Sequence, residues 1–92
     1  MFGKIQLENF NGITQMPQDV ASAWHDAFDG LVGVGYKPLV YLGKQIVNGV
    51  NYYFVAEQTF MTNPVYRRVV CLAINANDND VTLIDESIRE II

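Results

Sequence analysis

Two runs of β-branched and aromatic residues meet at the Asn-Gly pair of residues 48–49, within the stretch KQIVNGVNYYF. Asn and Gly both tolerate positive φ, and a two-residue loop made of them matches the twist of antiparallel strands. We therefore predict a hairpin with a two-residue turn, in which Val47 lies opposite Val50. Such a hairpin commits the chain to an antiparallel sheet.

The predicted pairing divides the hairpin into two faces. One face carries Leu39, Tyr41, Gly43, Tyr52, Phe54 and Ala56, and the other carries Val40, Leu42, Lys44, Tyr53, Val55 and Glu57. A sheet that is covered on one side normally alternates apolar and polar residues more cleanly than this. The apolar surplus on the second face predicts a homodimer contact or another partner there. The residues of this dimer face are Val40, Leu42, Tyr53 and Val55.

One segment, residues 17–31, has the pattern of an amphipathic helix. Pro17 suits the first helical position, because its missing N–H needs no partner there, and Asp19 complements the positive end of the helix dipole. We expect Gly30 or Gly33 to end the helix in the left-handed conformation. The apolar stripe facing the sheet is predicted to be Val20, Ala21, Trp24, Ala27, Phe28 and Leu31.

Strand-like segments lie on both sides of this helix. A loosely alternating stretch precedes it at residues 3–10, and three β-type runs follow at 39–47, 50–61 and 65–75. A last run, 81–92, begins as a strand and ends in a segment that fits either a strand or a frayed helix. The order of one strand, one helix and four strands predicts an α+β fold, with the helix packed on a curved four- or five-stranded antiparallel sheet.

Length and charge narrow the class of protein. The 92 residues, half of them hydrophobic, suffice for a single domain over 1–92. A net charge of −4, with no basic cluster larger than Arg67-Arg68, argues against a nucleic-acid partner. We find neither a signal-peptide pattern nor a membrane-length apolar stretch, so we expect a cytoplasmic protein without membrane association. A mature chain trimmed from a secreted precursor would have the same features.

The residues that could carry chemistry are sparse. Cys71 is the only cysteine, which rules out a disulfide within the chain and a multi-cysteine zinc site. His25 on the polar side of the helix and Cys71 in an apolar strand are poorly placed for a Cys–His nucleophile pair. Residues 75–86 superficially resemble a calcium loop, but Asp80 occupies the sixth position, where such a loop needs glycine. We expect no enzyme, no catalytic residue, no metal and no cofactor.

Residues 45–49, QIVNG, fit the Q-x-V-x-G pattern of the cystatins, which are reversible inhibitors of papain-like cysteine proteases. The following NYYF is close to the aromatic strand start that cystatins often carry. The order of strand, long helix and four strands also resembles the cystatin fold, and the length is similar to the disulfide-free stefins. The resemblance implies a non-enzymatic inhibitor whose loops enter the cleft of a papain-like cysteine protease as a wedge.

The resemblance also implies which residues touch the protease. Gly3 stands for the family's N-terminal glycine, and a second loop contributes Asn77 and Asp78. This second loop departs from the Pro-Trp pair of many cystatins, since it carries Asp78 and Asp80 instead. The first loop, expected to be a stiff, outward-pointing tip, contributes Gln45, Ile46, Val47, Asn48 and Gly49.

Two other functions remain open at this point. One is a structural or assembly module of the same fold, which dimerises through the second face and has no protease target. The other is a small-ligand carrier, in which tyrosines line a pocket, although aromatic residues in strands are usually core or cross-strand partners. The tyrosines concerned are Tyr36, Tyr41, Tyr52, Tyr53 and Tyr66.

Overall fold

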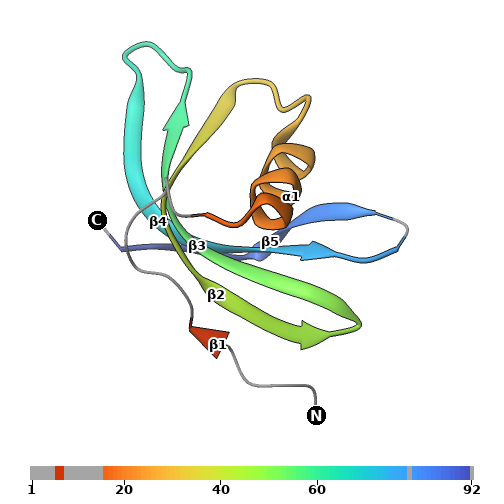
Figure 1. Cartoon of the computed structure of the whole chain (residues 1–92). Helices are drawn as coiled ribbons and strands as arrows, with labels where there is room; N and C mark the ends of the chain where they lie inside the picture. Colours follow the sequence, from red (N-terminus) through yellow and green to blue (C-terminus); the bar gives the residue numbers. More distant parts are fainter. Residues whose placement is uncertain (1–5, 8–15, 79, 92) are drawn as a thin grey trace.

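The computed structural model describes residues 6–7, 16–78 and 80–91 (Figure 1). Within these ranges it contains one helix and one sheet with the strand order β1-β2-β3-β4-β5, each strand antiparallel to its neighbours. The predicted α+β class is confirmed. In chain order the elements are β1 (Gln6–Leu7), α1 (Gln18–Phe28), β2 (Val34–Val47), β3 (Gly49–Phe60), β4 (Tyr66–Ala76) and β5 (Val81–Glu90).

The sheet curls around α1, which lies on its concave face (Figure 1). The indole ring of Trp24 meets the ring of Phe54 edge-on at 4.7 Å between centroids, and the ring of Phe28 lies 4.3 Å from Trp24. Burying a large apolar side chain contributes about 1.5–3 kcal/mol, so these contacts hold the helix on the sheet. The buried core consists of Val20, Ala23, Tyr41, Tyr52, Phe54, Ala56, Val70, Leu72 and Ile74.

The helix is shorter than predicted, because it ends at Phe28 rather than at residue 31. Gly30 follows with φ of 80°, so the prediction that a glycine takes the left-handed position after the helix is confirmed there. Leu31, expected in the buried stripe, lies beyond the helix and is 44% exposed. Ala21 is exposed as well, and Ala23 is buried in its place, since Ala23 lies one turn from Val20 on the same side.

The turn between β2 and β3 differs from the predicted two-residue turn. Ile46 pairs with Val50 and Val47 with Gly49, so Asn48 alone stands at the apex. Gly49 has φ of 95°, whereas no non-glycine residue in the described part of the chain has a positive φ. A two-residue primed turn needs positive φ at Asn48 too, so a different turn forms, with Asn48 at its apex and Gly49 in the left-handed conformation.

This turn shifts the predicted strand pairing by one residue, so that Lys44 rather than Gln45 lies opposite Tyr52. An irregularity in β2 between Tyr41 and Gly43 increases the shift to two residues, and the extra residue there restores the predicted alternation of faces. Beyond it, Tyr41 pairs with Phe54, and both are buried. Tyr41, Tyr52, Phe54 and Ala56 therefore share the core as expected, although the predicted pairs are wrong.

β2 is longer than predicted, and the last run proves to be a strand over most of its length, which decides between the two alternatives left open for it. β2 begins at Val34, in a glycine-rich stretch that was not predicted to be a strand, and β5 continues to Glu90. β5 has its own irregularity, where the Ser87 hydroxyl accepts a hydrogen bond from the Ala73 N–H at 2.8 Å and donates to the Ile84 carbonyl at 2.5 Å. The hydroxyl thus replaces a backbone acceptor, which keeps the β4 backbone satisfied where the pairing is interrupted.

Candidate functional site

The tips of the β2–β3 and β4–β5 hairpins lie side by side at one end of the sheet (Figure 1). In a sheet of consecutive antiparallel strands, every second turn falls at the same end, so the β3–β4 turn lies at the opposite end. The first tip has Asn48 at its apex. The second begins at Asn77, whose N–H donates to the Asp80 carbonyl at 3.0 Å and closes the turn. We call this end of the sheet the tip end.

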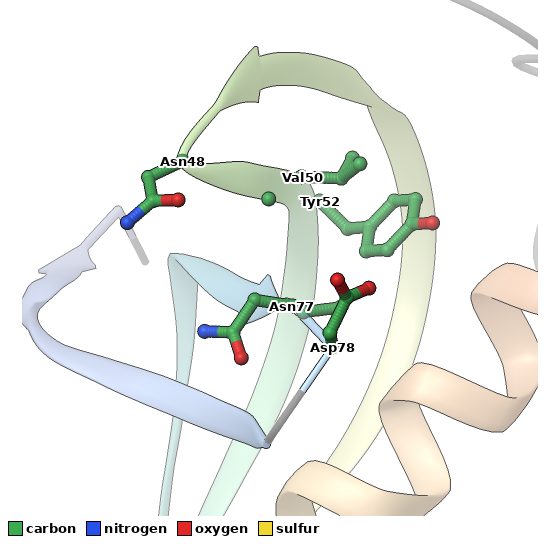
Figure 2. Close-up of a pocket in the computed structure, with 7 residues that line it drawn as sticks. Asn48, Val50, Tyr52, Asn77 and Asp78 are labelled. Carbon is green, nitrogen blue, oxygen red and sulfur yellow. The ribbon is translucent and has the colours of Figure 1, made fainter.

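An open recess of about 480 Å³ lies between the two tips (Figure 2). Its apolar side consists of buried Tyr52 and half-buried Val50, both on β3. Figure 2 shows the carboxylate of Asp78 directed toward the Tyr52 ring, whereas the Asn77 amide points away from it. The complete lining is Asn48, Gly49, Val50, Tyr52, Ala76, Asn77 and Asp78.

Gly49 allows the two tips to approach each other closely. A Cβ atom at this position would overlap the carbonyl oxygen of Ala76 and would lie 2.9 Å from the Cβ of Asn77. The positive φ of Gly49 adds a second reason for glycine, because side chains are strained in that conformation. The pairing of Val50 with Ala76 starts directly beside this contact. The shape of the recess therefore depends on a glycine at position 49.

Amide side chains join the two hairpins. The Nδ2 of Asn75 donates to the Oδ1 of Asn51 at 2.9 Å and, at 3.4 Å, to the carbonyl of Asn48. The Nδ2 of Asn77 donates to the Oδ1 of Asn75 at 3.1 Å, and the Oδ1 of Asn77 accepts from the N–H of Asp80 at 3.1 Å. This chain of hydrogen bonds runs from one tip to the other and orients both.

The structure separates the predicted first-loop residues into two groups. Gln45 accepts a hydrogen bond from the Tyr53 hydroxyl at 2.8 Å, so its side chain belongs to the face of the sheet away from α1. Ile46 is 47% exposed, and Val47 is half-buried. Only Asn48 and Gly49 of this group line the recess.

The predicted second-loop residues, Asn77 and Asp78, are exposed and also line the recess, so the structure brings them together with the first tip. Gly3 lies outside the described residues. Sequence reasoning missed Val50 and Ala76 as lining residues, and of the five tyrosines considered for a ligand pocket only Tyr52 lines this recess. Val50 and Ala76 lie next to the tip residues in the sequence, but the register between β3 and β4 is needed to predict that they line one recess.

The predicted dimer face is an apolar strip on the side of the sheet away from α1. Tyr53 and Val55 alternate with buried core residues, and Ala73 and Cys71 lie opposite them on β4. Val40 pairs with Val55 and extends the strip onto β2. The four predicted residues, Val40, Leu42, Tyr53 and Val55, are all half-buried.

The groups considered for chemistry are dispersed. His25 is exposed on α1, which packs on the concave face, whereas Cys71 lies on the other side of the sheet. Among the described residues, no three His, Cys, Asp or Glu side chains gather as a metal site. The only helix in the described ranges lacks the length and apolar character to span a bilayer.

Comparisons with known proteins add no family to this geometry. The chain matches no family model, and searches of curated proteins and of solved structures find no significant match. The resemblance of residues 45–49 to the cystatin motif stays a prediction. The function has to be argued from the tip end itself.

Proposed function

We propose that this chain is a non-enzymatic protein-binding domain that uses its paired hairpin tips as the binding edge. The adjacency of the two tips, with Gly49 in contact with Ala76, is the observation that carries the proposal. The hydrogen bonds around Asn75 hold both tips in place before any partner arrives. A pre-organised edge loses little conformational entropy on docking, which favours binding.

The proposed partner is a papain-like cysteine protease, and the proposed fold is cystatin-like. The Q-x-V-x-G motif at 45–49 supports this partner, because it falls on one of the two tips. Ile46 offers exposed apolar surface, and Asn48 stands at the apex, where backbone can enter a narrow cleft. Firm inhibition requires an interface of about 800 Å² per partner, which several loop tips together can approach.

An inhibition assay with matched variants tests this function. Ile46 at the tip end and Val65 beside the β3–β4 turn are both 47% exposed, so Ile46→Asp and Val65→Asp introduce the same charge at opposite ends. Each protein is titrated into papain with a fluorogenic peptide substrate. We expect inhibition by the wild type at micromolar concentration, a loss of about tenfold or more for Ile46→Asp, and little change for Val65→Asp.

Two outcomes would reject the proposal. Absence of inhibition by the wild-type protein would remove papain-like proteases as the partner class. Equal weakening by Ile46→Asp and Val65→Asp would show that the tips are not the contact.

A second candidate function is a structural or assembly module that dimerises through the face away from α1. The half-buried apolar strip of Tyr53, Val55 and Cys71 favours it, because apolar surface left open to solvent often marks a contact with a partner. Light scattering at increasing concentration tests it. We expect a wild-type dimer that Val55→Asp converts to a monomer, and a wild type that stays monomeric would reject this role.

A further inference from the structure

The recess at the tip end combines three kinds of surface. Tyr52 and Val50 form an apolar and aromatic side, and Asp78 places a carboxylate facing the Tyr52 ring (Figure 2). Asn48 and Asn77 border the recess from the two tips and are its uncharged polar residues. The volume of about 480 Å³ falls within the range of sites that hold small molecules or single side chains.

This combination suits a cation on an apolar stem. An aromatic ring attracts a cation at its face, and a carboxylate forms charge-assisted hydrogen bonds with ammonium or guanidinium groups. The methylene stem of lysine or arginine packs on apolar surface while the charged head stays among polar groups. The lining side chains thus match the two parts of such a residue.

The charges around the recess favour a cation over an anion. Asp78 lines it, Asp80 closes the same turn, and no lining residue is basic. Lys44 lies opposite Tyr52 in the strand pairing but does not line the recess. The chain as a whole has a net charge of −4, so an anionic ligand would meet repulsion on approach.

We propose that the recess receives a lysine or arginine side chain of the partner protein. This inference rests on the proposed function of the tip end as a binding edge, and it adds the chemistry of the partner residue at its centre. Tyr52 and Asp78 are the residues that select the cation. The bonded asparagines position the walls around it.

A titration followed by ¹⁵N–¹H NMR spectra tests the recess without any partner protein. The probes are the acetyl methylamides of arginine and lysine, and the acetyl methylamide of norleucine is the uncharged control of similar length. We expect the two cationic probes to shift the amide signals of recess residues and to saturate with a millimolar Kd. Norleucine should bind about fivefold more weakly, which corresponds to one exposed charge contact.

Matched variants assign the effect to Asp78. Asp78→Asn keeps the shape of an exposed side chain and should weaken both cationic probes about fivefold, whereas Asp85→Asn, exposed on β5 outside the recess, should not. Equal binding of norleucine, unchanged binding by Asp78→Asn, or no saturation by about 100 mM probe would overturn the proposal.

The papain assay separates this inference from the proposed partner. Probe binding without papain inhibition would support the recess and reject the protease. Papain inhibition without selective probe binding would support the protease and reject the recess.

Discussion

At the tip end of the sheet, amide side chains bond to one another around a recess, whereas the β3–β4 end exposes large apolar side chains. The apolar residues lie on two segments, the α1–β2 connection and the β3–β4 turn, which the Met61 N–H joins by donating to the Gly33 carbonyl at 2.9 Å. Val32 is 92% exposed and Met61 63%. The exposed large apolar residues of these two segments are Leu31, Val32, Met61 and Val65, and Tyr66 at the start of β4 adjoins them.

The hydrogen-bonded amide networks at the two ends differ in burial. Near the β3–β4 end the bonded amide is buried: Gln58 is 3% exposed, donates to the Tyr36 hydroxyl at 2.6 Å, and accepts from the Nε of Arg68 at 2.5 Å. At the tip end the corresponding network, around Asn75, lies close to the surface.

The difference teaches which end is able to choose a partner. Hydrogen-bond donors, acceptors and a carboxylate in fixed positions bind one arrangement of partner groups more strongly than others. The tip end can therefore discriminate between partners. The hydrophobic effect is non-directional, so the exposed apolar surface of the β3–β4 end adds affinity to any contact but little selectivity. Four substitutions break or sharpen this comparison.

The largest expected effect is at Gly49. Gly49→Ala should lower the free energy of unfolding by about 3 kcal/mol, because strain at positive φ adds to overlap with the Ala76 carbonyl. Gly30→Ala has a similar φ but no atom within 4 Å, so it should cost only about 1 kcal/mol. Urea denaturation measures both, and equal costs would mean that the two tips are not in close contact.

Gln58 should come next. Gln58→Ala removes the partner of both Tyr36 and Arg68 in a buried setting, and it should lower the free energy of unfolding by about 2 kcal/mol. Gln18→Ala, at an exposed position at the start of α1, is the control and should change stability by less than about 0.5 kcal/mol. Similar values for both in urea denaturation would show that the buried network adds nothing.

Asn75→Ala should have a smaller effect on stability, about 1 kcal/mol, because water can reach the groups it leaves unpaired. Amide hydrogen exchange at both tips should become faster, since the bonds from Asn75 to Asn51 and Asn48 are lost. Thr62→Ala removes an exposed hydrogen bond at the opposite end and should leave tip exchange unchanged. Faster tip exchange in Thr62→Ala would contradict the separation of the two ends.

The smallest effect is expected at Val32. Val32→Ser changes a side chain that is 92% exposed, so the free energy of unfolding should stay within about 0.5 kcal/mol of wild type. Val20→Ser, at 2% exposure in the core, is the contrasting variant and should cost more than about 2 kcal/mol. A large loss in Val32→Ser, measured by thermal unfolding, would mean that this end is covered in solution.

Local patterns predicted most of the fold. The helix period around Trp24, and the alternation around Phe54, depend on residues a few positions apart, and both placed these two residues correctly in or against the core. The helix period also assigned Ala21 and Leu31 to the buried side, and both are exposed. The candidate site was only half predictable. Asn48, Gly49, Asn77 and Asp78 were named in advance through the resemblance to the cystatin loops. Gln45 was wrongly paired with Tyr52, because one residue in a turn changes every strand pair beyond it.

By itself, the sequence determined that one amphipathic helix accompanies a series of antiparallel hairpins, since helix period, strand alternation and turn residues are local properties. Only the tertiary structure decided that Gly49 meets Ala76, that Tyr52 and Asp78 line one recess, and that an irregularity beside Tyr41 returns it to the core. Those outcomes depend on the register between strands and on packing across the sheet. Register is settled by the sum of many distant contacts, which no short stretch of sequence contains.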